Sequence, residues 1–173
     1  GRPLDRGALY ELWGGPGGRA SPAGPTGRPL IGTGDWNDGM DLVGAGGTGE
    51  SVWLAWFLAD VLEGMAELAE AVGQEGAAKE YRRQRVETIR RIDAVAWDGE
   101  WYRRATFDDG TPLGSSLNTE ARIDLLPQAW ATITDGGDPD RAATALDSAW
   151  KHLVRPDERM VLLFDPPFDK TEP

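Results

Sequence analysis

Apolar side chains recur at steps of three and four positions in several stretches of the chain, a spacing that predicts amphipathic helices. The longest stretch covers residues 54–72; Thr48 or Ser51 can cap its start, and Gly73 is suited to its end. A second helix is predicted over residues 76–96, with apolar positions on one face and arginines on the other. Because few residues separate the two helices, we expect an antiparallel pair.

Two further helices are predicted in the second half of the chain. One has its apolar positions within residues 123–133 and tolerates Pro127 only in its first turn. The other begins at Asp138-Pro139, an N-cap followed by a proline at the first helical position. Between the helical pairs, residues 97–113 alternate in character and contain the turn Asp108-Asp109-Gly110, which predicts a β-hairpin. The fold class is therefore mainly α, with a short β-hairpin insertion.

The N-terminal part has a different composition. Residues 12–28 are mostly Gly, Pro, Ala and Ser, which bury too little apolar area to offset the entropy lost on ordering. We predict an irregular or disordered leader over residues 1–29, a helical unit over residues 30–169 and a tail over residues 170–173. A reading-frame error or a genuine insertion would each explain residues 12–28. Because the chain begins at Gly1 without an initiator Met, we expect an internal fragment.

Charge and cysteine content narrow the function classes. The chain has 29 acidic and 18 basic residues, a net charge of -11, which argues against binding to nucleic acid or to an anionic membrane surface. It has no cysteine, which excludes disulfides and thiolate metal sites and suits a reducing cytoplasm, and one histidine leaves little for other metals. No apolar run approaches the roughly 20 residues that span a bilayer. We therefore expect no metal, no cofactor and no direct membrane contact.

The strongest chemical signal is the run Asp35-Trp36-Asn37-Asp38, which has glycines on both sides. Indole rings stack on the apolar faces of sugar rings, amide and carboxylate groups hydrogen-bond hydroxyls, and a shielded carboxylic acid can protonate a glycosidic oxygen. The run therefore fits a site that cleaves sugars. Taken alone, it is better explained as an acidic turn around a buried tryptophan.

The sequence around this run resembles glycoside hydrolase family 94, the inverting glycoside phosphorylases. The resemblance is closest to the phosphorylase domain of cyclic β-1,2-glucan synthase and extends to cellobiose phosphorylase. Four segments carry it in order: Gly32 to Met40; Gly49 to Phe57; Trp97 to Arg104 with Phe107 to Gly114; and Arg122 to Asp124 with Gln128 to Trp130. Several long, aromatic-rich motifs are far more specific than one short pattern. The resemblance covers residues 30–169 and implies part of an (α/α)6 barrel.

The resemblance also implies roles for the run. Asp38 would be the general acid, Trp36 would line the donor sugar subsite, and Asp35 and Asn37 would support substrate binding. The reaction would cleave or form β-glucosidic bonds, with β-1,2 favoured, using inorganic phosphate and inverting to α-glucose 1-phosphate. Phosphate is itself the nucleophile, so one acid suffices. That acid must stay protonated, and we therefore predict that Asp38 is buried beside Trp36 and near Asp35.

Two other function classes remain open. An inverting hydrolase would need a second carboxylate about 6.5–9.5 Å from Asp38, and a carbohydrate-binding or interaction remnant would bind sugar without turnover. In the family, the phosphate-binding His and a Thr-Gly loop lie beyond Pro173, so we expect this chain alone to be inactive. The expected partners are a gluco-oligosaccharide and phosphate. The parent would be cytoplasmic, as part of a larger synthase chain anchored in the inner membrane or as a homodimer.

Several other residues have a structural interpretation. Glu50 is expected to be a favourable first-turn charge rather than an acid catalyst, and His152 a surface or core-edge residue in the last turn of a helix. The arginines in residues 82–91 are expected on a solvated helix face. Tryptophans at helical spacing are expected in the core: Trp53, Trp56, Trp130 and Trp150. Three residues at family motif positions are expected to order the barrel interior: Arg122, Asp124 and Gln128.

Overall fold

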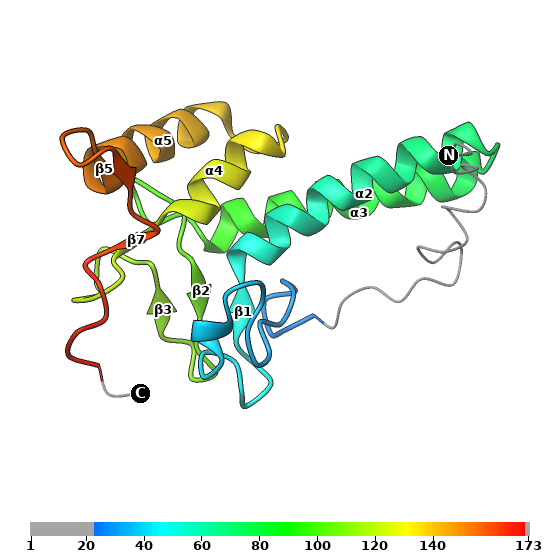
Figure 1. Ribbon diagram of the computed structural model, residues 1–173. Coiled ribbons are helices and arrows are strands. Elements are labelled where there is room, and N and C mark those ends of the chain that lie inside the picture. Colours follow the sequence, from blue (N-terminus) through cyan, green and yellow to red (C-terminus); the bar gives the residue numbers. More distant parts are fainter. Residues whose placement is uncertain (1–22, 172–173) are drawn as a thin grey trace, which may run out of the picture.

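The structure is a computed structural model that describes residues 23–171, except for the side chain of Asp38. Most of the predicted leader, residues 1–22, lies outside the described residues. Within the described part there are four α-helices: α2 (Val52–Ala71), α3 (Glu75–Val95), α4 (Leu125–Ile133) and α5 (Pro139–Leu153). A short 3-10 helix, η1, covers Asp38–Met40. The described chain is therefore mainly helical (Figure 1).

The strands of the described part have two residues each and form three small antiparallel sheets. They are β1 (Glu50–Ser51), β2 (Ala105–Thr106), β3 (Pro112–Leu113), β4 (Ile123–Asp124), β5 (Val154–Arg155), β6 (Met160–Val161) and β7 (Phe164–Asp165). The first three form one sheet in the order β1-β2-β3, β4 pairs with β7, and β5 pairs with β6.

Helices α2 and α3 form the predicted antiparallel pair and extend from the rest of the molecule as a long arm (Figure 1). The N-cap of α2 is Ser51 and not Thr48, because the Ser51 hydroxyl accepts a hydrogen bond from the backbone N–H of Leu54 at 3.0 Å. Gly73 follows the helix with a φ of +76°, the left-handed conformation that favours glycine at a helix end. Local capping chemistry thus sets both ends of α2.

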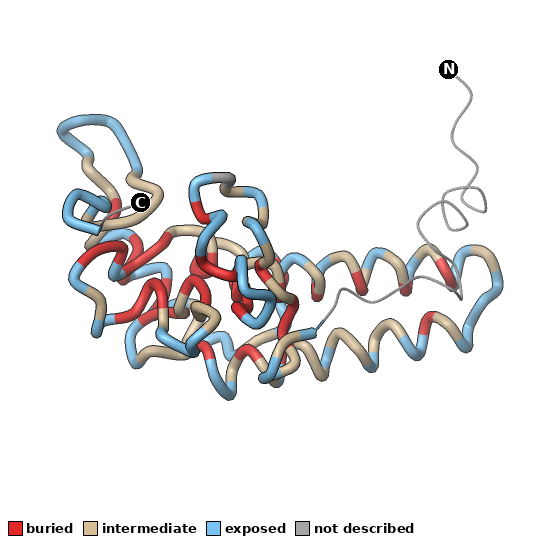
Figure 2. The backbone as a smooth tube through the Cα atoms, turned by 90° about the horizontal axis from the view of Figure 1, so that it is seen from below, coloured by how far each residue is buried: buried red, intermediate tan, exposed pale blue. Residues whose placement is uncertain are grey.

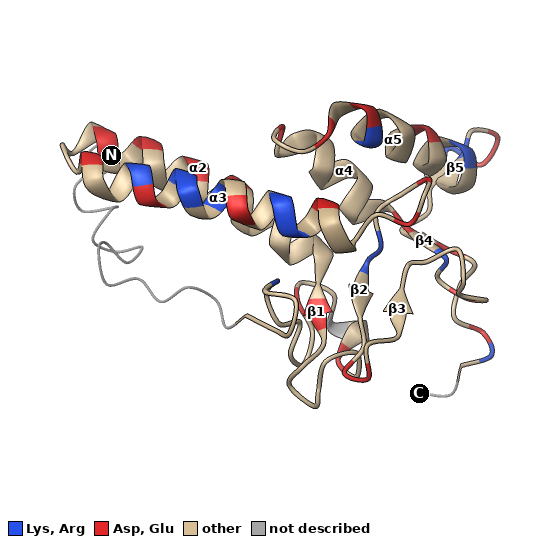
Figure 3. Ribbon diagram, turned by 180° about the vertical axis from the view of Figure 1, so that it is seen from behind, with Lys and Arg blue, Asp and Glu red and all other residues tan. Residues whose placement is uncertain are grey.

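Basic and acidic residues alternate along the arm (Figure 3), and Arg83 and Arg90 of α3 are exposed, as predicted. Arg85 departs from the prediction, because its side chain is only 16% exposed and donates to the carbonyl of Thr134 at 2.7 Å. Arg83 pairs with Glu80, and Arg90 pairs with Glu87 one turn earlier. Arg82 reaches across to Glu63 of α2 at 3.1 Å. Exposed pairs of this kind contribute about 0–1 kcal/mol each to the free energy of unfolding, so they add little to the stability of the arm.

The predicted hairpin is confirmed but is shorter than the sequence pattern indicates. Strands β2 and β3 pair antiparallel, with Ala105 opposite Leu113. Residues 97–104 are not a regular strand, because Trp101 and Tyr102 are adjacent and both buried instead of alternating between two faces. On its other side β2 pairs with β1, which ties the hairpin to the start of α2.

The second helical pair, α4 and α5, lies on the other side of the sheet from the loop of residues 23–49 (Figure 1). Pro127 is the third residue of α4 and so falls in its first turn, as predicted. Asp138 caps α5, and Pro139 is its first residue. Helix α4 begins at Leu125, later than the apolar spacing indicates, because Ile123 belongs to strand β4.

The main core lies where the base of the arm meets α4 and α5, and buried residues gather there (Figure 2). Its members are Val52, Ala55, Trp56 and Ala59 of α2, Ile89 and Ile92 of α3, and Ala96, Tyr102, Ala131 and Ala145. Trp56 is completely buried, as predicted, whereas Trp53 and Trp130 are only partly buried. None of the described helices has the length and apolarity needed to cross a bilayer.

The prediction that Trp150 packs in the core is wrong. Its side chain is 68% exposed, because α5 turns Ala145, Ala149 and Leu153 inward and presents Trp150 to the outside. His152 is partly buried at the end of the same helix, with its ring edge-on to Trp101 at 5.7 Å. Its predicted place at the edge of the core is confirmed.

Candidate functional site

The run Asp35-Trp36-Asn37-Asp38 lies in the loop that precedes β1 and packs against the three-stranded sheet. Ile31, Met40 and Val43 are buried on both sides of the run. They share one apolar cluster with residues of β2 and β3. The loop is thus anchored before and after the run, and the polar residues lie on a fixed backbone.

Asp35 is the best-anchored member of the run. Its Oδ1 accepts hydrogen bonds from Nη2 of Arg104 at 2.6 Å and from the backbone N–H of Asn37 at 3.3 Å. Its Oδ2 accepts from the hydroxyl of Ser51 at 2.8 Å. Burial by itself would raise the pKa of Asp35, but the hydrogen bond and charge of Arg104, with the Ser51 and Asn37 bonds, hold this pKa below its usual value. The carboxylate is therefore ionised and faces inward.

Arg104 joins this carboxylate to a second one. The Arg104 side chain is completely buried, and its Nε lies 3.4 Å from Oδ2 of Asp124. Burial raises the pKa of Asp124 to about 6, although the charge of Arg104 and the backbone N–H of Leu126 oppose the shift. Two carboxylates therefore share one guanidinium beneath the loop.

The other members of the run are placed differently. Trp36 is 50% exposed and lies edge-on to Trp53, with 6.4 Å between ring centroids. The Asn37 side chain caps η1 by accepting from the backbone N–H of Gly39 at 3.1 Å. Asp38 is the first residue of η1, and the prediction of its buried carboxyl lies outside the described residues. The loop thus turns its indole outward and its first carboxylate inward.

Trp36 is the first ring of a row of aromatic side chains in contact, and the row ends at α4. Trp53 stacks on Phe57 at 5.7 Å, and Phe57 meets Trp130 edge-on at 5.3 Å. Phe57 is 37% exposed. Trp53 and Trp130 are therefore not the fully packed core residues that their spacing predicts, and the row offers apolar ring surface next to the run.

A comparison with known protein families shows which family the chain belongs to. Residues 9–173 match the model of the glycosyl hydrolase 94 superfamily, catalytic domain. The chain belongs to this superfamily. The run, the cap of α2 and Arg104 all lie within the matched residues of this family 94 chain.

Three relatives illustrate the range of the family. A cyclic beta-(1,2)-glucan synthase of Rhizobium meliloti is 43% identical over 149 residues, which cover 86% of this chain and 5% of that protein. A solabiose phosphorylase of Paenibacillus borealis is 38% identical over 71% of this chain and 16% of its own length. A cellobionic acid phosphorylase of Neurospora crassa is 32% identical over 83% of this chain and 18% of its own length. The family 94 chain thus spans less than a fifth of each relative.

Glu50 does not have the place that the sequence indicates. It lies in β1, before the first turn of α2, and forms a buried ion pair with Nη2 of Arg28 at 2.8 Å. Its other oxygen accepts from the backbone N–H of Thr26 at 2.8 Å. The expectation of a favourable first-turn charge is therefore wrong, since Glu50 anchors the loop of residues 23–29 to the sheet.

Gln128 links Tyr102 and Asp124 in the interior of the described part of the family 94 chain. Oε1 of Gln128 accepts from the backbone N–H of Tyr102, and its Nε2 donates to the carbonyls of Tyr102 and Asp124, each at 2.8 Å. Arg122 differs, because its side chain is exposed and only its backbone takes part: its carbonyl accepts from Nε1 of Trp101, and its N–H donates to the carbonyl of Asp165. The interior around Tyr102 and Asp124 is thus held by hydrogen bonds between side chains and backbone groups.

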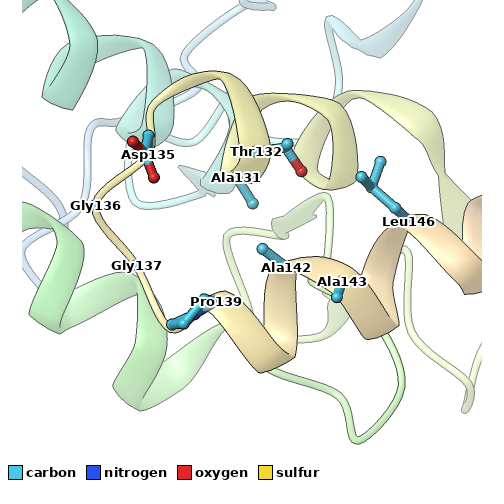
Figure 4. A pocket seen from close by; sticks show the side chains of 9 residues that line it. All are labelled: Ala131, Thr132, Asp135, Gly136, Gly137, Pro139, Ala142, Ala143 and Leu146. Atoms are coloured by element: carbon cyan, nitrogen blue, oxygen red, sulfur yellow. The ribbon is translucent and has the colours of Figure 1, made fainter.

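A hollow of about 280 Å³ between α4 and α5 is separate from the run (Figure 4). Its lining is mostly small and apolar: Ala131, Thr132, Asp135, Gly136, Gly137, Pro139, Ala142, Ala143 and Leu146. Among the described residues there is also no group of three or more His, Asp or Glu side chains placed to hold a metal ion. The candidate site therefore remains the run and the groups beneath it.

The sequence indicates all four residues of the run but not the groups that hold them. Arg104 lies within a family motif, yet its contact with Asp35 joins positions 69 residues apart. Ser51 was recognised only as a helix cap. An arginine next to a hairpin strand indicates a support for the candidate loop only once the strand pairing shows that it is buried.

Proposed function

We propose that the protein with this chain is a glycoside phosphorylase that cleaves a β-glucosidic bond of a gluco-oligosaccharide with inorganic phosphate, inverting to α-glucose 1-phosphate. The observation that carries the proposal is the half-exposed indole of Trp36 on a loop that is anchored through Asp35. Family membership supports it, as do the names of two relatives, a solabiose phosphorylase and a cellobionic acid phosphorylase. The higher identity to a beta-(1,2)-glucan synthase supports a β-1,2 preference.

In the proposed reaction the carboxyl of Asp38 donates its proton to the glycosidic oxygen as the bond from that oxygen to the anomeric carbon breaks. A phosphate oxygen forms the new bond to this carbon from the opposite face, which inverts it. Trp36 stacks on the sugar ring, and Asn37 supports the turn that carries the acid. Arg104 already offsets the charge of Asp35, so desolvation must supply most of the increase in pKa that a general acid requires.

We also propose that the two helical pairs, α2–α3 and α4–α5, are neighbouring units of an (α/α)6 barrel. Their antiparallel arrangement and their shared core at the base of the arm support this architecture. The loop that carries the run would then lie at one end of the barrel, where loops can gather residues around a substrate.

The hydrolase alternative requires a free carboxylate that activates water on the far side of the sugar. Asp35 belongs to the run and Asp124 lies beneath it, but both side chains are buried and both face Arg104. Neither is free to act on solvent water. These two carboxylates are therefore poor candidates for the base of a hydrolase, which supports the phosphorylase proposal.

The test uses the protein expressed from its complete reading frame, assayed on β-1,2- and β-1,4-linked gluco-disaccharides with and without phosphate. The proposal predicts phosphate-dependent release of α-glucose 1-phosphate, its loss in Asp38→Asn, and its retention in Asp41→Asn, an exposed aspartate three residues further on. Free glucose released equally with and without phosphate would identify a hydrolase. Sugar binding without any turnover would identify a binding remnant.

A further inference from the structure

The backbone of Arg104, the residue before β2, is fixed by hydrogen bonds on both sides and by a close approach of Gly114. Its backbone N–H donates to the carbonyl of Leu113 at 2.8 Å, and its carbonyl accepts from the backbone N–H of Val52 at 3.0 Å. Gly114, with a φ of +75°, lets the chain approach closely, since a Cβ there would lie 2.6 Å from the Arg104 nitrogen. The guanidinium therefore extends from a backbone that is fixed on both sides.

From this backbone the guanidinium contacts three separate elements. Nη2 donates to Asp35 of the candidate loop at 2.6 Å, and Nη1 donates to the Ser51 hydroxyl, the cap of α2, at 3.2 Å. Nε lies 3.4 Å from Asp124, the cap of α4. All three contacts are buried. The planar guanidinium of arginine has N–H groups that point to three sides, so it can contact three acceptors at once. A lysine ammonium is a single point charge.

We infer that Arg104 is a positioning residue, which fixes the loop of Asp35 to Asp38 relative to the starts of α2 and α4. Arg104 acts through Asp35 and does not itself contact the sugar. The inference rests on the proposed phosphorylase function, because the loop carries the proposed acid and the sugar-stacking indole. A displacement of about 1 Å in such a group is enough to lower turnover about a hundredfold.

The first experiment measures backbone hydrogen exchange in Arg104→Lys. Hydrogen bonds to charged groups contribute enough for their loss to speed local opening by about tenfold or more. We expect this increase in peptides that cover residues 31–43, with unchanged exchange in α3 and α5. The matched control is Arg103→Lys at the preceding arginine, whose partly exposed side chain pairs with Asp98 at 2.8 Å; it should leave loop exchange as in the wild type.

The second experiment measures kinetics in the same variants. We expect kcat to fall about a hundredfold in Arg104→Lys, while the KM for phosphate stays unchanged because the loop holds only the sugar side of the reaction. Arg103→Lys should keep both values. A general loss of stability would instead raise hydrogen exchange throughout the chain and lower turnover on every substrate by the same factor.

The two experiments separate the inference from the function on which it rests. Unchanged or uniformly raised exchange in folded Arg104→Lys overturns the positioning role, whatever the enzyme does. If the wild type shows no phosphate-dependent turnover, the proposed function fails, and the exchange data still decide whether Arg104 holds the loop. Should Arg104→Lys not fold, Asp35→Asn removes the same ion pair, and unchanged loop exchange in that variant overturns the inference.

Discussion

The hydroxyl of Ser51 donates a hydrogen bond to Oδ2 of Asp35 at 2.8 Å, and Oγ of Ser51 accepts one from the backbone N–H of Leu54 at the start of α2. One small side chain therefore belongs both to a helix cap and to the support of the candidate loop. These two contacts lead in opposite directions along the chain, and the hydroxyl also accepts from Nη1 of Arg104 at 3.2 Å. The position of the loop is thus coupled to the integrity of the first turn of α2.

We expect Ser51→Ala to lower the free energy of unfolding by about 1–2 kcal/mol, because the helix loses its cap, and to weaken sugar binding as well. Urea unfolding and calorimetric titration with a gluco-oligosaccharide measure the two effects. Asp138→Ala removes a comparable cap from α5, far from the loop in sequence, and should lower stability without changing sugar affinity. Equal sugar affinity in wild type and Ser51→Ala would contradict the coupling.

Glu50 and Arg28 form an ion pair in which each side chain is only 2% exposed. We expect Glu50→Ala to cost about 3–5 kcal/mol of stability, because it leaves a buried guanidinium without its partner. The double substitution of Arg28→Met with Glu50→Leu should recover most of that loss. Chemical denaturation of the three proteins measures both effects. A stable Glu50→Gln variant that has lost all turnover would instead support an acid role for Glu50.

Features that depend on neighbouring residues could be predicted from the sequence. The spacing of apolar side chains located the four helices, and Ser51, Gly73 and Asp138 marked their ends by local chemistry. The turn of the hairpin was identified for the same reason. In each case the residues that decide the structure lie within about one helical turn or one tight turn of each other.

Features that depend on distant residues could not be predicted. Glu50 pairs with a residue 22 positions away, and Arg104 with one 69 positions away, so neither ion pair leaves a local pattern. The spacing of Trp150 fits a buried face, but α5 packs through Ala145, Ala149 and Leu153, and periodicity does not reveal which face of a helix is covered. The residues of the run were found because their chemistry is local, whereas their supports required the fold.

Trp36 and Trp150 are both exposed tryptophans, at 50% and 68%, but only Trp36 lies in the run. We expect Trp36→Ala to weaken binding of a gluco-oligosaccharide at least tenfold, which corresponds to about 1.4 kcal/mol, with little change in stability. Trp150→Ala is the matched control and should bind sugar like the wild type. Calorimetric titration measures the affinities, and equal losses in both variants would argue against a sugar-stacking role for Trp36.

Asp124 should make stability depend on pH in an unusual direction. Burial raises its pKa to about 6 in the folded chain, whereas an unfolded aspartate titrates near 3.9. Between about pH 4 and pH 6 the folded state therefore keeps a proton that the unfolded chain has released, so this group's contribution to the free energy of unfolding falls as pH rises. That contribution is complete below pH 4 and is lost above pH 6.

Asp124→Asn isolates this effect, because asparagine is an equally good helix cap and does not titrate. Relative to the variant, the wild type should lose stability, by up to about 3 kcal/mol, between pH 4 and pH 7. Urea unfolding of both proteins at several pH values measures the difference, in which the contributions of the acidic groups away from Arg104 cancel. If the difference stays constant over this range, the carboxyl of Asp124 is ionised throughout. The guanidinium of Arg104 then balances both buried carboxylates more strongly than its 3.4 Å distance to Asp124 implies.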